Sequence, residues 1–153
     1  MPLYLVRHGV AYSEVADPDR SLTEAGKATV DGMAQLTAAF NIPVSRILHS
    51  GKTRARQTAD IFSKHLKPSA GVKEIKGIRP NDDVTIIASK LDPALNAMIV
   101  GHLPFLERLV SYLIIELPDK SIIKFQAGGI VCLDQIEKNG SWHVKWALMP
   151  KMV

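Results

Sequence analysis

The sequence predicts an α/β fold, a three-layer sandwich whose mixed sheet is mostly parallel and which has no large cap insertion. Two patterns support this prediction. Short apolar runs alternate with segments of helical period, as in sheets whose parallel strands are joined by crossover helices. Near the C-terminus, two strand-like runs flank Asn139-Gly140, a dipeptide typical of tight hairpins, so one edge of the sheet is expected to be antiparallel.

A polar loop separates the first predicted strand from the first predicted helix. Leu3 to Val6 is a short apolar run typical of a buried strand, and it stops at Arg7-His8-Gly9. The segment from Ser13 to Ser21 is polar and contains a proline, so it is expected to be a loop. A helix is then predicted from Glu24 to about Phe40, with Thr23 as its N-cap.

The middle of the chain repeats the alternation of strand and helix. A second strand is predicted around Ile47-Leu48, and a second helix from Thr53 to about Leu66. A third strand is expected at Val72 to Ile75. A short helix should follow, beginning at Asp82 or Asp83 and running to Leu91.

The last third of the chain adds one more strand and helix and then the hairpin. Ala97 to Val100 is an apolar strand, and Pro104 opens a helix that runs to Ile115. The hairpin strands are expected at Ile130 to Ile136 and Trp142 to Leu148. In the second of them, Trp142 and Trp146 are expected to share one face and to pack on the sheet.

The composition indicates a single globular domain over residues 1–153. The chain has 153 residues, of which 46% are hydrophobic and 22% charged, and its formal net charge is +4. A chain of this length can bury roughly 70% of the surface that its unfolded form exposes, so it needs no disulfide or structural metal to fold. The single cysteine, Cys132, lies in an apolar run and is expected to be a buried thiol.

The sequence gives no sign of a membrane or nucleic-acid partner. The longest apolar stretch, Leu109 to Leu117, is interrupted by polar residues and is shorter than the roughly 20 residues of a spanning helix. The N-terminus lacks the pattern of a secretory signal, so we expect a cytoplasmic protein. Basic residues are spread along the chain and form no block typical of nucleic-acid-binding segments.

Ionisable residues follow three of the predicted strands. They are Arg7-His8, His49-Ser50 and His102, and Arg54 lies one turn into a following helix. Because ligands of open α/β sheets bind beyond the carboxyl ends of the strands, we expect these side chains to converge on one cleft. Arginine binds phosphate bidentately, and imidazole can be a nucleophile near neutral pH. No carboxylate follows these strands to complete a metal set, so the sequence predicts a metal-independent site for phosphoryl transfer.

Three motifs in this region resemble the histidine phosphatase superfamily, which includes the phosphoglycerate mutases. Leu5-Val6-Arg7-His8-Gly9 is similar to the opening signature of the family. Ser50 with Arg54-Ala55-Arg56-Gln57-Thr58 is similar to its second motif, and Val100-Gly101-His102 to its third. The match runs in order from residue 3 to about 115, and the short length with Gly101-His102-Leu103-Pro104 most resembles the SixA-type phosphohistidine phosphatases.

The resemblance implies a phosphoglycerate mutase-like fold and a phosphatase that needs no cofactor. His8 would be the nucleophile and would form a transient phosphohistidine. Arg7 and Arg54 would bind the phosphoryl oxygens, and His102 would donate to the transferring group and stabilise its charge. This agrees with phosphoryl transfer in general, where catalysis depends mainly on positioning and on neutralising charge. The attacking nitrogen must be unprotonated, so the other ring nitrogen must donate to a partner, which the sequence does not identify.

Two positions depart from the family pattern. Gly51 stands where many members have a proline, and this is expected to alter only the loop. Larger relatives carry a carboxylic general acid before the middle helix, where this chain offers only Asp82 and Asp83, both expected to be helix N-terminal residues. Without a strong acid, ordinary phosphomonoesters should be hydrolysed poorly, whereas imidazole leaves phosphohistidine more readily. The expected substrate is therefore a protein that carries phosphohistidine.

Three other functions remain open at this point. The chain could act on a small phosphorylated metabolite as a broad phosphomonoesterase, or it could bind phosphate without turnover. The third alternative is a nucleotide-binding module. Gly51-Lys52-Thr53 resembles the end of a P-loop, although Arg46 stands where that motif requires a glycine. His49 is a candidate for substrate contact, whereas His65 and His143 are expected to be structural.

Overall fold

The computed structural model describes residues 2–137 and 140–151, and it contains one six-stranded sheet with the order β3-β2-β4-β1-β5-β6. The strands are β1 (Pro2–Arg7), β2 (Arg46–His49), β3 (Val72–Glu74), β4 (Ala97–Gly101), β5 (Ile130–Gln135) and β6 (Trp142–Leu148). The first four are mutually parallel, while β5 runs antiparallel to β1 and β6 antiparallel to β5. The predicted mixed, mostly parallel sheet with an antiparallel edge is confirmed.

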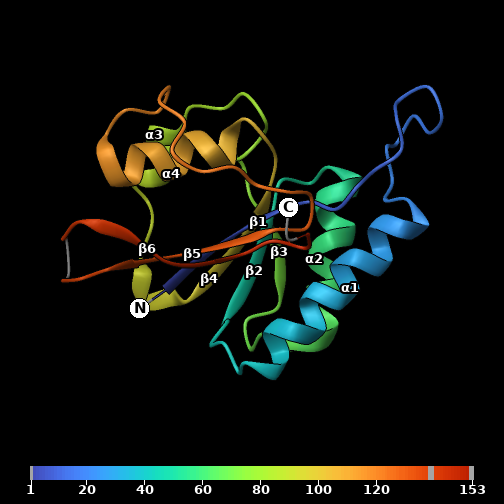
Figure 1. The fold of residues 1–153 in the computed structure, drawn as a ribbon, viewed down its shortest axis with the longest axis horizontal. Helices are drawn as coiled ribbons and strands as arrows, with labels where there is room; N and C mark the ends of the chain where they lie inside the picture. The colour runs from blue at the N-terminus through green and yellow to red at the C-terminus, as the bar shows by residue number, and fades with distance from the viewer. Residues whose placement is uncertain (1, 138–139, 152–153) are drawn as a thin grey trace.

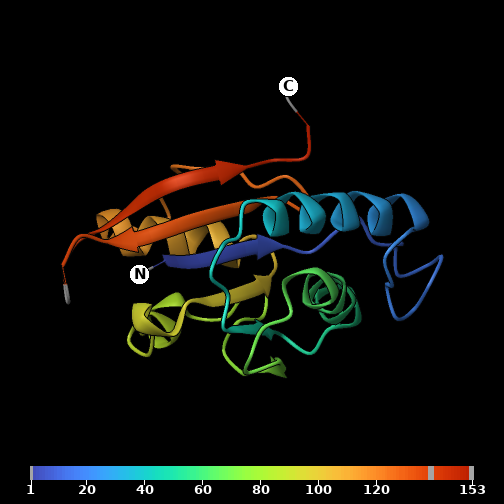
Figure 2. The same ribbon diagram turned by 90° about the horizontal axis from the view of Figure 1, so that it is seen from below.

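Two helices cover each face of the sheet, which makes the three predicted layers (Figures 1 and 2). On one face lie α1 (Glu24–Ala39) and α2 (Thr53–Leu66), and on the other lie α3 (Val84–Ala88) and α4 (Phe105–Ile115). A 3₁₀ turn at Pro93–Leu95, which the sequence did not predict, leads into β4. None of the helices in the described part of the chain is long and apolar enough to cross a membrane.

Strand alternation divides the core between the two faces. In β1, Leu3 and Leu5 pack towards α3 and α4, whereas Tyr4 and Val6 pack towards α1 and α2. Cys132 is a buried free thiol in the second of these clusters, as predicted. Burial on both faces explains why β1 and β4 read as continuous apolar runs.

The helix termini follow the capping signals, with one difference in length. The Thr23 hydroxyl accepts the Gly26 N–H at 2.9 Å and caps α1, as predicted. Asp83 caps α3 by accepting the Thr85 N–H at 2.9 Å, but this helix ends at Ala88 and not at Leu91. The three residues after Ala88 continue in tighter turns, in which Lys90 and Leu91 donate to carbonyls only three residues back.

The predicted hairpin is confirmed in its strands, while Asn139 lies outside the described residues. The register shifts between Cys132, which faces Trp146, and Leu133, which faces Val144, so Lys145 is an extra residue in β6. The bulge reverses the side-chain alternation beyond it. Trp142 therefore packs with the α3 and α4 face and Trp146 with the α1 and α2 face, so the prediction that they share a face is wrong.

Candidate active site

The strand order β2-β4-β1 places three strand ends side by side at one edge of the sheet. These ends carry His49-Ser50, Gly101-His102 and Arg7-His8, and the His8 N–H donates to the Gly101 carbonyl at 3.0 Å. The rings of His8 and His102 lie 5.1 Å apart between centroids, tilted by 52°. The structure therefore brings together residues that the sequence separates by almost a hundred positions.

The His8 ring is held in one tautomer by its neighbour in the chain. Its Nδ1 lies 2.7 Å from the Gly9 carbonyl oxygen, which can only accept, so Nδ1 carries the proton. Its Nε2 is then unprotonated, and the lone pair of this nitrogen accepts the Arg54 Nε–H at 3.4 Å. Burial, together with Arg54, Arg7 and Arg20, lowers the pKa of His8 to about 4 against the opposing effect of the bond to Gly9. The ring is therefore neutral at physiological pH, and its Nε2 is unprotonated.

Hydrogen bonds from the first turns of α2 hold the backbone next to His8 in place. Thr58 is fully buried, accepts the Gly9 N–H at 3.1 Å and donates to the Arg54 carbonyl at 2.8 Å. Gly9 itself is required by close packing, because a Cβ there would lie 2.7 Å from Val30 Cγ2 in α1. One hydroxyl thus links the backbone beside the nucleophile to the helix that carries Arg54.

Arg7 is held by a segment far along the chain. Its guanidinium donates to the Phe125 carbonyl at 2.9 Å, and its backbone bonds Gly128 and Gly129. Glu107 in α4 accepts the Phe125 N–H at 3.0 Å and so fixes the backbone that receives Arg7. The sequence analysis missed this role of Glu107, since nothing in the local pattern links α4 to the segment before β5.

His102 is buried and bonds Ser50. Its Nε2 lies 2.6 Å from Ser50 Oγ, while its Nδ1 is buried with no hydrogen-bond partner in the described part of the chain. Ser50 Oγ also accepts from the Lys52 N–H at 3.4 Å, which leaves the hydroxyl proton free for His102 Nε2. Burial, together with His8, Arg54 and further cations, lowers the pKa of His102 to about 3. This ring is also neutral, and with Ser50 donating, its Nδ1 carries a proton with no acceptor.

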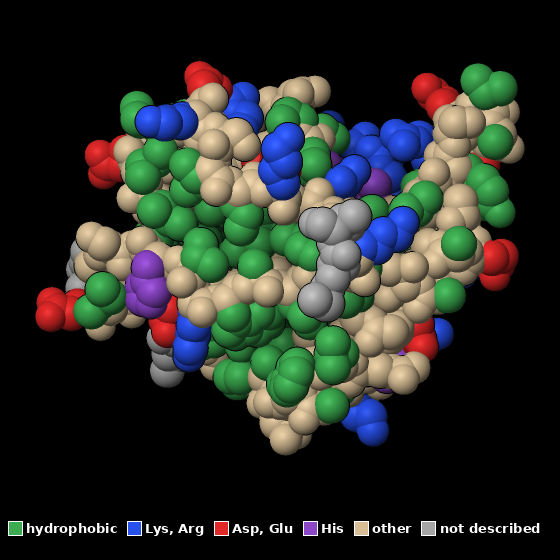
Figure 3. Space-filling model, viewed as in Figure 1, with side chains coloured by type: hydrophobic (Ala, Val, Ile, Leu, Met, Phe, Trp, Pro, Cys, Tyr) green, Lys and Arg blue, Asp and Glu red, His purple; other side chains and the backbone are tan. Residues whose placement is uncertain are grey.

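Two further cations, Arg20 and Lys52, face the site and were missed by the sequence analysis. An open cleft of about 420 Å³ lies between the loop before α1 and the start of α2, lined by Glu14, Pro18, Asp19, Arg20, Gly51, Lys52, Thr53 and Arg54. Lys and Arg side chains gather there beside a histidine (Figure 3). Burial and Arg20 lower the pKa of Arg54, which shows how close the cations stand. Arg20 lies in a loop of no regular period, so only its position shortly after the His8 motif could have suggested it.

The remaining candidates bond to nearby backbone. His49 Nδ1 accepts the Gly51 N–H at 3.1 Å, and Asp82 accepts the Arg79 N–H at 2.8 Å. His65 bonds Asp31 across α2 and α1 at 2.7 Å, a structural contact as predicted. Gly51 has φ +88°, which proline cannot adopt, so its loop takes a path closed to the proline of other family members.

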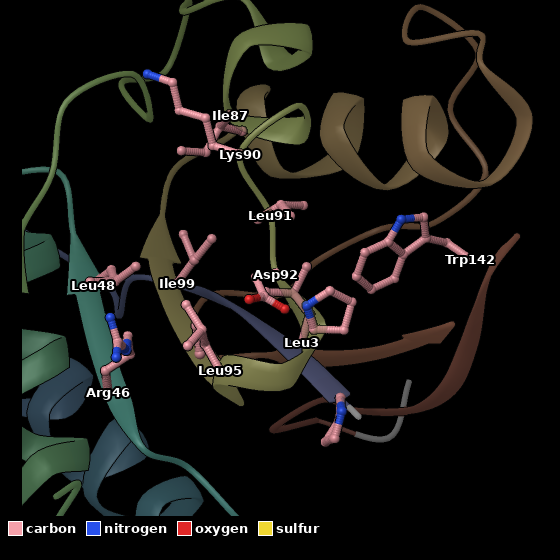
Figure 4. Close-up of a pocket in the computed structure, with 13 residues that line it drawn as sticks. Leu3, Arg46, Leu48, Ile87, Lys90, Leu91, Asp92, Leu95, Ile99 and Trp142 are labelled. Carbon is pink, nitrogen blue, oxygen red and sulfur yellow. The ribbon is translucent and has the colours of Figure 1, made fainter. Parts of the chain in front are cut away.

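Two further features lie apart from this cluster. A small apolar pocket of about 90 Å³ opens at the opposite, amino ends of the strands, where Leu3, Leu48, Ile99 and Trp142 line it (Figure 4). It contains none of the predicted site residues. Within residues 2–137 and 140–151, no three His, Cys, Asp or Glu side chains stand close enough to hold a metal ion.

Comparison with known sequences identifies the family. The sequence model of the histidine phosphatase superfamily (branch 1) matches residues 3–79. An uncharacterized protein of Picosynechococcus sp. is 33% identical in an alignment 115 residues long, which covers 68% of this chain and 67% of that protein. Mouse PGAM5, named a mitochondrial serine/threonine-protein phosphatase, is 34% identical over 65 residues, and this match spans 42% of the chain but only 23% of PGAM5.

Comparison with solved structures gives the fold over nearly the full chain. The protein histidine phosphatase SixA, in complex with tungstate, superimposes with a TM-score of 0.85 at 24% identity, covering 98% of this chain and 97% of SixA. A protein of Agrobacterium tumefaciens provisionally named as the phosphohistidine phosphatase SixA gives 0.76 at 26% identity, with 97% of each chain covered. The chain therefore belongs to branch 1 of the histidine phosphatase superfamily, as a SixA-like phosphatase.

Proposed function

We propose that the protein is a metal-independent phosphatase that removes the phosphoryl group from phosphohistidine on another protein, through a phosphohistidine intermediate on His8. The observation that carries this proposal is the state of the His8 ring. It is neutral, its proton is held on Nδ1 by the Gly9 carbonyl, and its Nε2 lone pair lies among arginines.

The reaction proceeds in two transfers. The Nε2 lone pair of His8 attacks phosphorus while the P–N bond of the substrate breaks, and the leaving imidazole takes the electron pair of that bond and a proton from water. Water then attacks phosphorus on His8, the electron pair of the P–N bond returns to Nε2 as its lone pair, and phosphate is released. The proton that the attacking water loses neutralises the hydroxide left by the first transfer. Arg7 and Arg54 bind the equatorial oxygens in both steps, and the Nδ1–H of His102 donates to a third position.

The positions of the carboxylates favour phosphohistidine over a phosphomonoester. An alkoxide leaving group needs a proton from an acid, but Asp82 and Asp83 both accept backbone N–H bonds of their own loop. The side chains recorded against the His8 ring are the Arg54 guanidinium and the His102 ring, whereas the carboxylates of Glu14 and Asp19 line the adjoining open cleft. An imidazole leaving group depends less on protonation than an alkoxide does. Phosphohistidine is therefore a substrate that such a site can still hydrolyse.

Two observations support a protein as the carrier of this group. The cleft beside Arg54 is open, and the segment between α2 and β4 holds only β3, α3 and a 3₁₀ turn, with no insertion large enough to enclose a metabolite. The similar proteins named above include SixA, called a protein histidine phosphatase, and PGAM5, called a protein phosphatase.

A dephosphorylation assay without magnesium, in the presence of a chelator, tests the proposal. It compares a phosphohistidine protein, the excised phosphohistidine peptide and a phosphoserine peptide, with wild type, His8→Ala and the control His65→Ala. We expect fast turnover of the phosphohistidine protein, slow turnover of both peptides, and loss of activity and of labelled enzyme only in His8→Ala. Equal turnover of protein and excised peptide would argue against a protein-shaped substrate.

The other outcomes assign the site differently. Preference for the phosphoserine peptide would make the protein a phosphomonoesterase with His8 as its nucleophile, and Asp82 or Asp83 as the acid to test. Binding of phosphate without turnover of any substrate would make it a binding module.

A further inference from the structure

Residues 10–21, which we call the arm, project from the molecule between the end of β1 and the start of α1 (Figure 1). The arm begins two residues after His8, and its inner side carries Arg20, which lines the cleft together with Lys52 and Arg54. A phosphoryl group bound to His8 therefore lies next to the base of the arm.

The arm is braced by its own hydrogen bonds. The Asp17 carboxylate accepts the N–H groups of Asp19 and Ser21, each at 3.0 Å, and also the Ser21 hydroxyl. These bonds lower the pKa of Asp17, so its carboxylate stays ionised at physiological pH. Tyr12 pairs with Ser21 across the arm, and Gln57 of α2 accepts the Leu22 N–H at the base at 2.7 Å. A surface that is already ordered loses little conformational entropy when it binds a partner.

The arm carries exposed apolar side chains. Val15 is 98% exposed, the most of any large hydrophobic residue in the described part of the chain, and Val10 and Tyr12 are 52% and 40% exposed. Single exposed apolar residues are ordinary, but three on one braced projection beside an active site are typical of a contact surface. Figure 3 shows hydrophobic side chains on the projection and a group of Lys and Arg side chains beside it.

The charges of the arm complement those of the cleft. Arg20, Lys52 and Arg54 suit a dianionic phosphoryl group, whereas Glu14 and Asp19 are exposed on the arm and form no ion pair among the described residues. A partner whose phosphohistidine enters the cleft thus meets an apolar contact at Val15 and negative charge at Glu14. Glu14 also lines the cleft, whereas Val15 does not, so a small metabolite in the cleft would not reach Val15.

We propose that the arm is the docking element for the protein substrate, and that it takes a phosphohistidine flanked by exposed apolar side chains and a basic one. This inference rests on the proposed phosphohistidine phosphatase function and adds the surface that selects the partner. Contacts on the arm are made before and after the chemical step alike, so they lower KM and leave kcat unchanged.

The test compares two substrates with the same P–N bond. One is a phosphohistidine carrier protein whose histidine lies beside exposed apolar and basic side chains, and the other is phosphoramidate. The variant is Val15→Asp, and the control is Ile136→Asp, which changes a residue of similar exposure (75%) beyond β5 on the far side of the molecule. Both positions are exposed, so the two proteins are expected to fold, and circular dichroism checks this.

We expect Val15→Asp to raise KM for the carrier protein at least tenfold, with kcat and the hydrolysis of phosphoramidate within twofold of wild type. Ile136→Asp should leave both substrates unchanged. Equal effects on both substrates, or no effect on the carrier, would overturn the docking role of the arm but not the phosphatase function. A wild-type enzyme that hydrolyses neither P–N substrate would overturn both. A wild-type dimer that Val15→Asp dissociates would assign the patch to a second copy of the chain.

Discussion

Because His8 and Gly9 are adjacent in the chain, the backbone itself sets the tautomer of the nucleophile. Many catalytic histidines are oriented by a carboxylate, which also raises their pKa. Here the partner is an uncharged carbonyl, and burial with nearby arginines holds the pKa of His8 at about 4. The ring is therefore deprotonated at Nε2, and its hydrogen-bond partners in the described part of the chain are the Gly9 carbonyl and Arg54 rather than a carboxylate.

The arginines beside this ring are expected to contribute most of the charge stabilisation. Arg7→Ala and Arg54→Ala should each cost about 3 kcal/mol of transition-state stabilisation, since each removes a preorganised donor. This loss lowers kcat/KM for the phosphohistidine protein roughly a hundredfold. Arg56→Ala is the matched control, because Arg56 lies on the same helix with its side chain exposed. If Arg56→Ala lowers kcat/KM as much as Arg54→Ala does, then the overall positive charge of the helix, and not contact with the phosphoryl group, is responsible for the effect of Arg54.

Glu107 is expected to act on the reaction through Arg7. Glu107→Ala removes the acceptor of the Phe125 N–H, so the carbonyl that receives Arg7 loses its support. We expect the rate of phosphoenzyme formation to fall about tenfold, equivalent to one lost hydrogen bond of ~1.4 kcal/mol. Glu107→Gln keeps an acceptor and should recover most of the rate. Equal stability of the two variants with equally slow rates would contradict the positioning role.

Within the elements, β6 shows how one residue decides which face a side chain occupies. A strand alternates strictly, so residues 142 and 146 would share a face in a regular strand. Lys145 interrupts this alternation as a bulge, and it places Trp142 against the α3 and α4 layer and Trp146 near Tyr4, at 6.0 Å between ring centroids. Trp142 therefore packs against the α3 and α4 layer only because the bulge is present.

Deleting Lys145 is expected to destabilise the protein far more than substituting it. Lys145→Ala keeps the chain length and should change the free energy of unfolding by less than about 0.5 kcal/mol. The deletion would turn Trp142, His143 and Val144 to the opposite face and should cost ~3 kcal/mol or more. Urea denaturation of both variants measures the difference, and similar midpoints would contradict the bulge assignment.

The sequence predicts those elements whose signals are local. The Thr23 cap, the range of α2 and the strand β4 all depend on residues within a few positions of one another, and they lie where the pattern puts them. The length of α3 and the faces of the two tryptophans were mispredicted, because tertiary contacts and a bulge decide them. In the site, motif residues such as His8 could be found from the sequence, whereas Arg20 could not, since its loop position becomes meaningful only after folding.

At the scale of the whole molecule, the neutral histidines link stability to pH. An unfolded histidine has a pKa of about 6.5, whereas the folded pKa values are about 4 for His8 and about 3 for His102. Between pH 6.5 and 4 the unfolded chain binds protons that the folded chain does not. The stability is therefore fully present above pH 6.5 and falls as the pH is lowered through this window.

We expect the free energy of unfolding to decrease by about 3 kcal/mol from His8 alone between pH 6.5 and 4. His8→Asn should flatten this slope, because it removes the group that titrates. The carboxylates of Asp17 and Asp83 have pKa values lowered by hydrogen bonds, to Ser21 and to the Thr85 N–H respectively. Their contribution to the stability of the protein is therefore lost only at lower pH. Chemical denaturation at several pH values measures the slope, and an unchanged slope in His8→Asn would contradict the buried neutral state.

The position of β4 between β1 and β2 has a consequence for the order in which the protein becomes active during synthesis. His8 and Arg54 leave the ribosome early, but they belong to elements that share no sheet edge until residues 97–101 have been added. The carbonyls that receive Arg7 come later still, at Phe125 and Gly129. A nascent chain therefore exposes every residue of the first two motifs while it has no catalytic site. Activity begins only when the central strand, the last of the four parallel strands to be made, closes the gap between its two neighbours.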